Sequence, residues 1–292
     1  MINRMACFSL PPELFSFYKM HVDYLTVHAV DPDKRRYSDP AEAPRHFIDI
    51  DHYGKNPFDS VPEKWKDAVE KFSEDSLIKY GIVPWHINIM YYRLVKAFRE
   101  KDVSRILYYS ANIGHYIADS HVPLHCTENY NGQLTNQTGI HGFWESRLPE
   151  LFGDDYDYFV GRAKYVNDVQ KFCWENVKQS NAALDSVLDF EKRLNDVFDS
   201  DKKYAHEVRG NQLIKVYSRE YAESYHTDLD GQVERRMQAA IIAVGSIWYT
   251  AWVNAGMPDL PSVNNPLNIV PEEEVKGVGD SLKTINGKRD CD

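Results

Sequence analysis

A stretch near the middle of the chain holds the side chains whose types and spacing are best suited to chemistry. His115 and Asp119 are four positions apart, and so are His141 and Glu145. On a helix, residues i and i+4 lie on one face about one turn apart, so each pair can direct an imidazole and a carboxylate toward one point. Zinc accepts both kinds of ligand. His125 lies between the two pairs, and the stretch has no pair of cysteines, which favours an open, hydrolytic zinc site over a structural one.

Helices are expected on both sides of this cluster because apolar residues recur there at helical spacing. Residues 101–121 carry an apolar stripe, and Pro123 is expected to end that helix. Residues 126–139 are polar, contain Asn-Gly and predict a loop. Another helix is expected at 141–152, and residues 29–59, rich in proline and aspartate, predict a long ordered loop.

The rest of the chain also reads as helical, with little period-two alternation. Asp230 is expected to cap a long apolar helix, and Gly256 to follow its end. The fold class is therefore mostly α, a single compact bundle of roughly seven or eight helices with long ordered loops. The further helices are expected at 13–28, 61–73, 85–100, 156–180, 182–198, 211–223 and 231–256.

Composition limits the classes of function and the domain organisation. The net charge of −10 gives no general attraction to nucleic acid or to anionic membranes, although bound cations can reverse the field locally. No apolar run is long enough to span a bilayer, and no signal peptide is visible at the start. Residues 1–258 are expected to form one domain, and the polar segment 259–292 a flexible or surface-wrapping tail.

The cysteines form no CxxC pair, so their spacing reports neither a disulfide framework nor a cellular compartment. Cys126 is next to His125 and could be a soft metal ligand, but a small buried side chain is the favoured interpretation. The four cysteines are Cys7, Cys126, Cys173 and Cys291.

The combined motifs resemble a known superfamily. GHYIADSHVPLH followed by HGFWE, together with the upstream string HAVDPDKRRYSDPAEAPRHFID, is similar to the zinc-dependent phospholipases C and the single-strand-specific zinc nucleases. The match runs from about residue 25 to 150 and includes a spacing of fifteen from Asp31 to His46. The resemblance implies a mostly helical fold and hydrolysis of phosphoric ester bonds by metal-activated water.

The same resemblance implies the ligands of two zinc ions. One ion would be held by Asp31, His46, His115 and Asp119, and the other by His125, His141 and Glu145. Asp31 would also be catalytic, orienting or deprotonating the attacking water. In the family, an N-terminal tryptophan and a following histidine hold a third zinc. The chain has neither residue before His21, so only two sites are expected, and a late-starting chain or a two-zinc variant would each explain this.

Other polar or aromatic residues near the ligands are candidates to line the cleft or to orient a ligand. Asp49 follows His46 closely, and carboxylates often hydrogen-bond to metal-bound histidines. This supporting set comprises Asp49, His52, Trp85, His86 and His121.

Glu145 and the short interval from His125 to His141 favour the phospholipase C branch, whereas the sequence motif His121-Val-Pro-Leu-His125 is closer to that of the nucleases. The expected partner is a phosphodiester, a phospholipid head group or a nucleotide. Transient contact with a membrane surface is compatible with this reading, and no protein partner is implied. The resemblance to this superfamily also implies export from the cytoplasm. The hypothesis of another class is a metal-binding or interaction protein that lacks catalysis.

Overall fold

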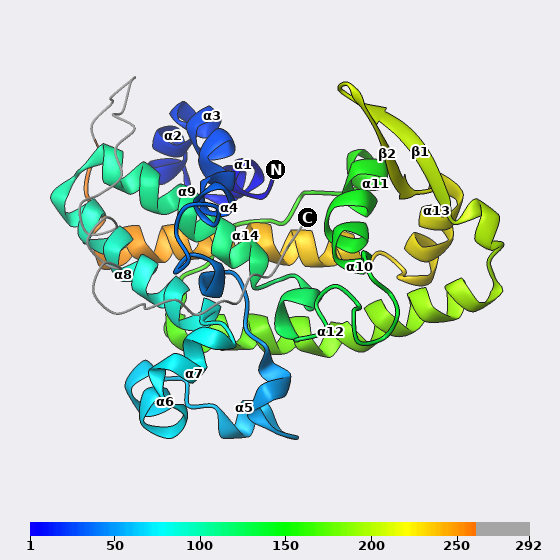
Figure 1. Ribbon diagram of the computed structural model, residues 1–292. Helices are drawn as coiled ribbons and strands as arrows, with labels where there is room; N and C mark the ends of the chain where they lie inside the picture. The colour runs from blue at the N-terminus through cyan, green and yellow to red at the C-terminus, as the bar shows by residue number, and fades with distance from the viewer. Residues whose placement is uncertain (261–292) are drawn as a thin grey trace.

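Four long helices organise the part of the chain that the computed structural model describes, residues 1–260 (Figure 1). They are α8 (Val83–Glu100), α9 (Val103–Asp119), α12 (Val169–Val197) and α14 (Gln232–Asn254). Helix α8 packs on the other three, and α14 also packs on α9. The main core lies between them, around large buried side chains such as Trp85, Trp248 and Tyr109. The mostly α prediction is confirmed.

Helix α9 follows α8 directly and ends where the site begins. Lys101 adopts a left-handed conformation that ends α8, and the Asp102 carboxylate accepts a hydrogen bond from the backbone N–H of Arg105 at 3.0 Å to start α9. The predicted apolar stripe is buried, and the helix ends at Asp119, four residues before Pro123.

The N-terminal segment forms several short helices instead of the single helix predicted at 13–28. His21 leaves helical geometry, with φ −108° and ψ 16°, and so divides that helix in two. Gly114 allows α9 to pack closely against α1, because a Cβ atom at this position would lie 1.9 Å from Oδ1 of Asn3. The elements are α1 (Ile2–Ala6), η1 (Cys7–Ser9), α2 (Pro12–Met20), α3 (Val22–Val27), η2 (His28–Val30) and α4 (Asp31–Arg35).

The region predicted as a long ordered loop contains only short helical turns and packs against the start of α8. Gly81, just before α8, permits this packing. Its φ is +89°, and a Cβ atom there would lie 2.2 Å from the carbonyl oxygen of Phe47. The helix predicted at 61–73 begins later, at Trp65. The elements are η3 (Ala43–Arg45), η4 (Ile50–Tyr53), α5 (Pro57–Ser60), α6 (Trp65–Phe72) and α7 (Glu74–Lys79).

The prediction of two helices, at 156–180 and 182–198, is wrong. Residues 156–168 run without helix or strand beside α14, and α12 is one continuous helix. Side chains of α14 take the place of helical hydrogen bonds: Ser246 Oγ accepts from the N–H of Lys164 at 3.0 Å, and Thr250 Oγ1 from that of Val166 at 2.9 Å. Asp168 then caps α12.

A β-hairpin replaces most of the helix predicted at 211–223. Strands β1 (Tyr204–Arg209) and β2 (Gln212–Tyr217) pair antiparallel and project from the helices as an arm (Figure 1). Gly210, with φ +58°, lies in the turn between them. Helix α13 (Arg219–Asp228) follows.

The last described helix agrees with its prediction at one end only. Gly256 follows α14 with φ +92°, as predicted, but Gly231 and not Asp230 is the N-cap residue. The remaining elements are η5 (Pro123–Cys126), α10 (Ile140–Gly142), the π-helical turn η6 (Phe143–Arg147), α11 (Leu148–Phe152), η7 (Gly153–Asp155) and η8 (Ser200–Lys202).

Two further predictions concern the membrane and the tail. No helix within residues 1–260 is long and apolar enough to cross a bilayer. The predicted tail and Cys291 lie outside the described residues, apart from residues 259 and 260. Among the described residues, Cys7, Cys126 and Cys173 are buried and form no disulfide, which agrees with the favoured interpretation of Cys126.

Candidate metal centre

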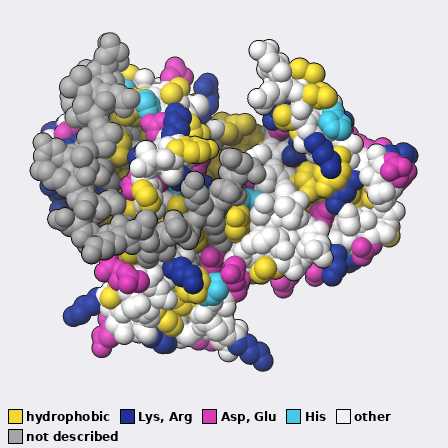
Figure 2. Space-filling view, in the orientation of Figure 1, with side chains coloured by type: hydrophobic (Ala, Val, Ile, Leu, Met, Phe, Trp, Pro, Cys, Tyr) yellow, Lys and Arg dark blue, Asp and Glu magenta, His cyan; other side chains and the backbone are white. Residues whose placement is uncertain are grey.

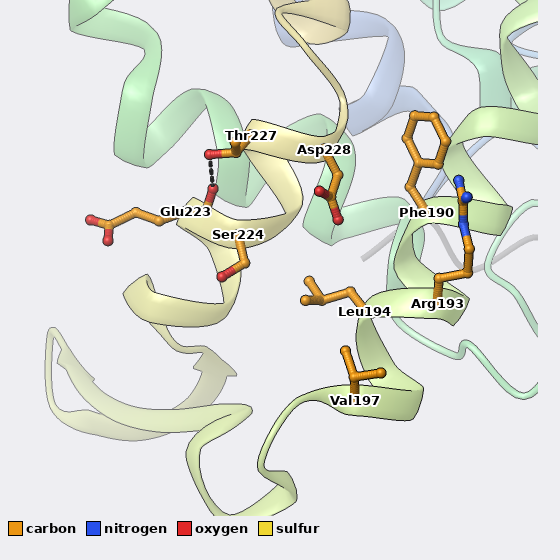
Figure 3. A pocket seen from close by; sticks show the side chains of 8 residues that line it. All are labelled: Phe190, Arg193, Leu194, Val197, Glu223, Ser224, Thr227 and Asp228. Carbon is orange, nitrogen blue, oxygen red and sulfur yellow. Dashed lines mark hydrogen bonds between the residues drawn. The ribbon is translucent and has the colours of Figure 1, made fainter.

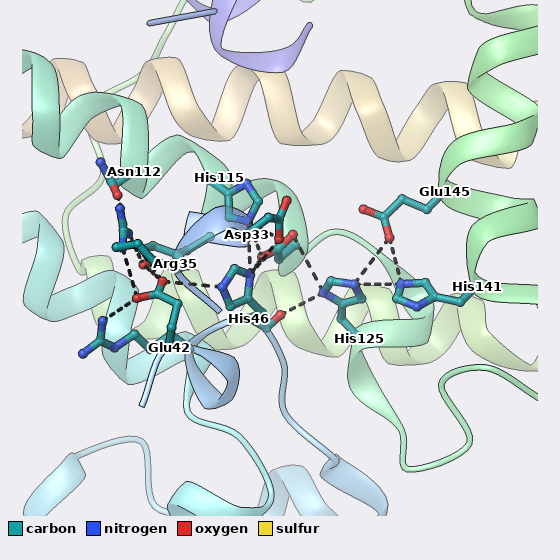
Figure 4. Close-up of polar contacts among 12 residues, drawn as sticks. Asp33, Arg35, Glu42, His46, Asn112, His115, His125, His141 and Glu145 are labelled. Atoms are coloured by element: carbon teal, nitrogen blue, oxygen red, sulfur yellow. Dashed lines mark hydrogen bonds and ion pairs between the residues drawn. The ribbon is translucent and has the colours of Figure 1, made fainter. Parts of the chain in front are cut away.

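The first ligand group, Asp33, His46 and His115, gathers three side chains from separate parts of the chain (Figure 4). Asp33 comes from α4, His46 follows η3, and His115 comes from α9. His46 Nδ1 lies 3.1 Å from His115 Nε2. Asp33 Oδ1 lies 3.4 Å from His115 Nε2 and 3.7 Å from His46 Nδ1.

Asp119 completes this arrangement from the last turn of α9. Its Oδ2 lies 2.9 Å from His46 Nδ1 and 3.3 Å from His115 Nε2. Ligand atoms bound tetrahedrally at about 2.0–2.1 Å from zinc are about 3.3–3.4 Å apart. These five separations, from 2.9 to 3.7 Å, are therefore close to the edge length of a coordination tetrahedron.

The second ligand group, His125, His141 and Glu145, lies beyond His46, on the side away from Glu42 (Figure 4). His141 Nε2 lies 2.9 Å from His125 Nε2 and 2.8 Å from Glu145 Oε2. The π-helical turn carries Glu145, and turns of this kind occur frequently at functional sites. Three protein ligands leave one position of a tetrahedral site open, the pattern of catalytic zinc.

A hydrogen bond fixes the orientation of the His125 ring. Its Nδ1 lies 2.8 Å from the carbonyl oxygen of His46 and must donate to it, because a carbonyl only accepts. In the neutral ring Nε2 is then an unprotonated acceptor directed at Nε2 of His141. Two ring nitrogens and a carboxylate at these distances need a proton or a cation between them, so the donor set fits a metal ion.

Both groups open into one cavity of about 280 Å³. Asp119 lies at the junction, since its Oδ1 is 3.9 Å from His125 Nδ1 while its Oδ2 faces the first group. An Arg36 side chain adds a cationic group to the wall. Among residues 1–260, no third group of three such side chains lies within the same distances.

A network of buried charged side chains lies on the side of His46 that faces away from His125 (Figure 4). Glu42, fully buried, pairs with Arg45 at 2.6 Å and with Arg35 at 3.3 Å, and accepts a hydrogen bond from the hydroxyl of Tyr116. His46 Nε2 lies 3.5 Å from Glu42 Oε1, which suits an ion pair better than a well-formed hydrogen bond. Glu42 therefore faces the nitrogen of His46 that points away from the cavity.

The electrostatics of both groups favour positive charge between the ligands. Burial alone would lower the pKa of His46, but the carboxylates of Asp119 and Glu42 outweigh it and raise that pKa to about 9. Burial alone would raise the pKa of Glu145, yet His125 and His141 hold it well below the usual range. A cation at either position would meet the same field.

The structure corrects the prediction for Asp31. Its Oδ2 bonds to Nδ1 of His28 at 2.6 Å and its Oδ1 to Nζ of Lys34 at 2.9 Å, so its carboxylate lies outside the ligand groups. Residues two apart on a helix point roughly 200° from each other, and Asp33 therefore faces His46 when Asp31 does not. The other six predicted ligands, His46, His115, Asp119, His125, His141 and Glu145, are brought together.

Of the supporting residues, His121, His86 and Trp85 are buried and do not line the shared cavity. The ring of His121 bonds to the carbonyl oxygen of Ile117 through Nδ1. His86 packs edge-on against Tyr116. Trp85 packs in the hydrophobic core, and its indole N–H donates to the carbonyl oxygen of Glu63.

The remaining two supporting residues do not line the shared cavity. The backbone N–H of Asp49 donates to the carbonyl oxygen of Tyr80 at 2.7 Å. His52 stacks on the Tyr80 ring and pairs with Glu128 at 3.0 Å.

Sequence reasoning missed Asp33 and Glu42. Glu42 is four residues before His46, the same acid–histidine spacing that identified the pairs on the helices, so that signal was available. Asp33 lies in the same proline-aspartate run as Asp31, and spacing alone does not separate the two.

A separate groove of about 780 Å³ runs between α12 and α13 (Figure 3). Leu194, Val197 and Phe190 form its apolar side. It contains no histidine or cysteine and shares no residue with the ligand groups.

Comparison with known proteins gives no further identification. No protein-family model matches the sequence, and no curated protein matches it.

Proposed function

We propose that this protein is a zinc-dependent hydrolase of phosphoric ester bonds, a phosphodiesterase of the phospholipase C type. The observation that carries the proposal is the pair of ligand groups opening into one cavity, with Asp119 at their junction. Two neighbouring divalent cations suit in-line displacement at phosphorus, because they can act on the attacking and the leaving oxygen together.

Zinc is the metal that this donor set fits best. The groups supply four imidazole nitrogens and carboxylate oxygens, without thiolates, and their separations suit tetrahedral coordination. Magnesium and calcium prefer sets made mainly of oxygen ligands. Bound zinc would supply Lewis acidity, making water nucleophilic near pH 7 and offsetting charge on phosphoryl oxygens.

The chain's own residues have distinct roles in this proposal. Asp33, half-exposed at the cavity, takes the role that the sequence suggested for Asp31: it orients the attacking water and accepts its proton. Hydrogen bonding to His115 outweighs burial and keeps the pKa of Asp33 below its usual value, so it is a carboxylate at neutral pH. Arg36 adds positive charge that would attract the phosphate.

The choice of substrate rests on the second ligand group. Its carboxylate is Glu145, and His141 follows His125 by sixteen positions; both features resemble the phospholipase C branch. A single-strand-specific nuclease is the alternative enzyme, and the sequence motif from His121 to His125 supports it. Export from the cytoplasm and transient contact with a lipid surface belong to the same proposal.

Metal analysis of two matched variants tests the metal centre. Asp33→Asn should lower zinc affinity because it removes a charged oxygen from the first ligand group, whereas Asp31→Asn should leave zinc content unchanged. Asp119→Ala should reduce the metal content further, since both groups adjoin that carboxylate. The centre is misassigned if the purified chain binds no zinc, or if Asp119→Ala retains the full complement.

Activity is tested on a phosphatidylcholine analogue, a simple aryl phosphodiester and single-stranded DNA. Hydrolysis of the lipid analogue and the aryl ester, lost with a chelator and restored by zinc, is the expected result. Cleavage of DNA alone would favour the nuclease. Zinc binding without hydrolysis of any substrate would support the remaining alternative, a metal-binding or interaction protein.

A further inference from the structure

A second cavity, of about 400 Å³, lies behind the metal centre. Its wall includes His115 and Glu145, one residue from each ligand group, and it extends from there to α14 and the N-terminal helix α1. Figure 2 shows the surface hollowed between the N-terminal helices and the hairpin arm, with hydrophobic side chains on the floor.

The wall of the second cavity is predominantly apolar. Helix α14 contributes Val233, Met237 and Ala240, which lie on one helical face, and Trp144 and Val122 add apolar surface. Trp144 donates its indole N–H to Gln232 at 3.2 Å, so it presents ring surface to its other neighbours. A wall of this composition suits a hydrocarbon or aromatic body, which gains free energy by leaving water.

One cationic side chain interrupts this apolar wall. Arg236 is only 9% exposed and also lines the cavity. Its Nε donates to the carbonyl oxygen of His121 at 2.9 Å, and its Nη2 to Ser180 Oγ at 2.5 Å and to the carbonyl oxygen of Asn176 at 3.5 Å. All three acceptors are uncharged, and they fix the plane of the guanidinium.

No carboxylate pairs with Arg236 among residues 1–260, and its Nη1 makes no hydrogen bond to any of them. A buried charge without a counter-charge is costly. Burial accordingly lowers the pKa of the guanidinium, which nevertheless remains charged at neutral pH. The cavity thus combines an apolar wall with an uncompensated positive charge whose remaining donors are available.

We propose that the second cavity binds an amphipathic anion, with its anionic head on Arg236 and its hydrocarbon or aromatic body against α14 and Trp144. A carboxylate or a phosphate monoester would suit the head, because a guanidinium offers paired donors to planar or tetrahedral oxyanions. The site needs no metal ion, so it stands apart from the proposed hydrolase activity.

Calorimetric titration of the full chain with octanoate, octanamide and octylamine tests the charge requirement. Octanoate should bind roughly tenfold or more tightly than octanamide, as expected of a charge-assisted hydrogen bond, and octylamine should not bind. Repeating the titration with a chelator separates this cavity from the metal centre, because binding at Arg236 should persist. Equal binding of octanoate and octanamide, or loss of octanoate binding with the chelator, would overturn the proposal.

Variants locate the binding site. Arg236→Gln should weaken octanoate binding roughly tenfold or more, and the exposed neighbour Arg235→Gln is the matched control that should not. Ala240→Leu reduces the cavity while keeping every contact of Arg236, so it tests the site even if Arg236→Gln fails to fold. Unchanged affinity in Ala240→Leu, or an equal loss in Arg235→Gln and Arg236→Gln, would show that octanoate binds elsewhere.

Discussion

Replacing Glu42 by glutamine should damage both stability and metal binding, for two separate reasons. The Glu42 side chain has 0% exposure, and its carboxylate is shared by Arg35 and Arg45, whose side chains are 26% and 14% exposed. The substitution keeps the shape but removes the charge, leaving two largely buried guanidinium groups without their counter-charge. It also removes the negative group behind His46 Nε2.

The expected loss of stability follows from this burial. Breaking a buried ion pair by removing one partner costs about 3–5 kcal/mol, and the partial exposure of the two arginines favours the lower end, about 3 kcal/mol. For a chain of this size such a loss lowers Tm by about 6 to 12 °C. The pKa of Glu42 lies well below its ordinary value because the paired cations and His46 outweigh burial, so its contribution is present above pH 4.5 and lost as pH falls below it.

Thermal unfolding monitored by circular dichroism measures the first effect. Glu100→Gln is the matched control: Glu100 also faces two cations, Arg105 and Lys96, but its side chain is 43% exposed, so the change should cost less than about 1 kcal/mol. Zinc titration measures the second effect, and affinity should fall about 10- to 100-fold, as for other groups that orient a metal-binding histidine. Equal Tm shifts in the two variants would refute the buried-pair reasoning, and unchanged zinc affinity in Glu42→Gln would refute the role in positioning His46.

Two further predictions concern other parts of the site. Burial and the nearby Arg236 lower the pKa of His121 to about 3, below the unfolded value of about 6.5, so the unfolded chain takes up a proton first as pH falls. Between pH 7 and pH 5 this residue should cost about 2 kcal/mol of stability, and His121→Gln should remove that part of the pH dependence in urea unfolding with a chelator present; an identical pH dependence would contradict a buried, neutral His121. Gly114→Ala should destabilise the fold by about 1–3 kcal/mol, because the added Cβ meets Asn3 Oδ1, and urea unfolding at pH 7 should show it; no loss would mean that α1 does not pack on α9 this closely.

Local geometry explains why most of the candidate metal centre could be predicted. His115 and Asp119 need only a helix to share a face, and His141 and Glu145 need only one helical run, even though part of it is π-helical. The apolar period of α9 was visible in the sequence and gave its burial correctly. Features set by residues within about one turn of each other were therefore predictable.

The errors occur where distant residues decide the local conformation. Residues 156–168 have helix-compatible sequence, but Ser246 and Thr250 of α14 satisfy their backbone donors, and nothing local reports this. Strand β2 has Leu213 and Ile214 adjacent, with no polar–apolar alternation, so its period was hidden until β1 paired with it. Tertiary hydrogen bonds and strand pairing override local preference in both places.

The sequence by itself determined the chemistry of the candidate centre: which imidazoles and carboxylates are present, and which of them share a helical face. Only the tertiary structure decided which aspartate of α4 joins them, because a two-residue step reverses the direction of the side chain and Asp31 is engaged by His28. It also decided that Arg236 faces an apolar cavity without a counter-charge. Such pairings join residues far apart along the chain or on different faces of a turn, where spacing carries no information and only folding sets the distance.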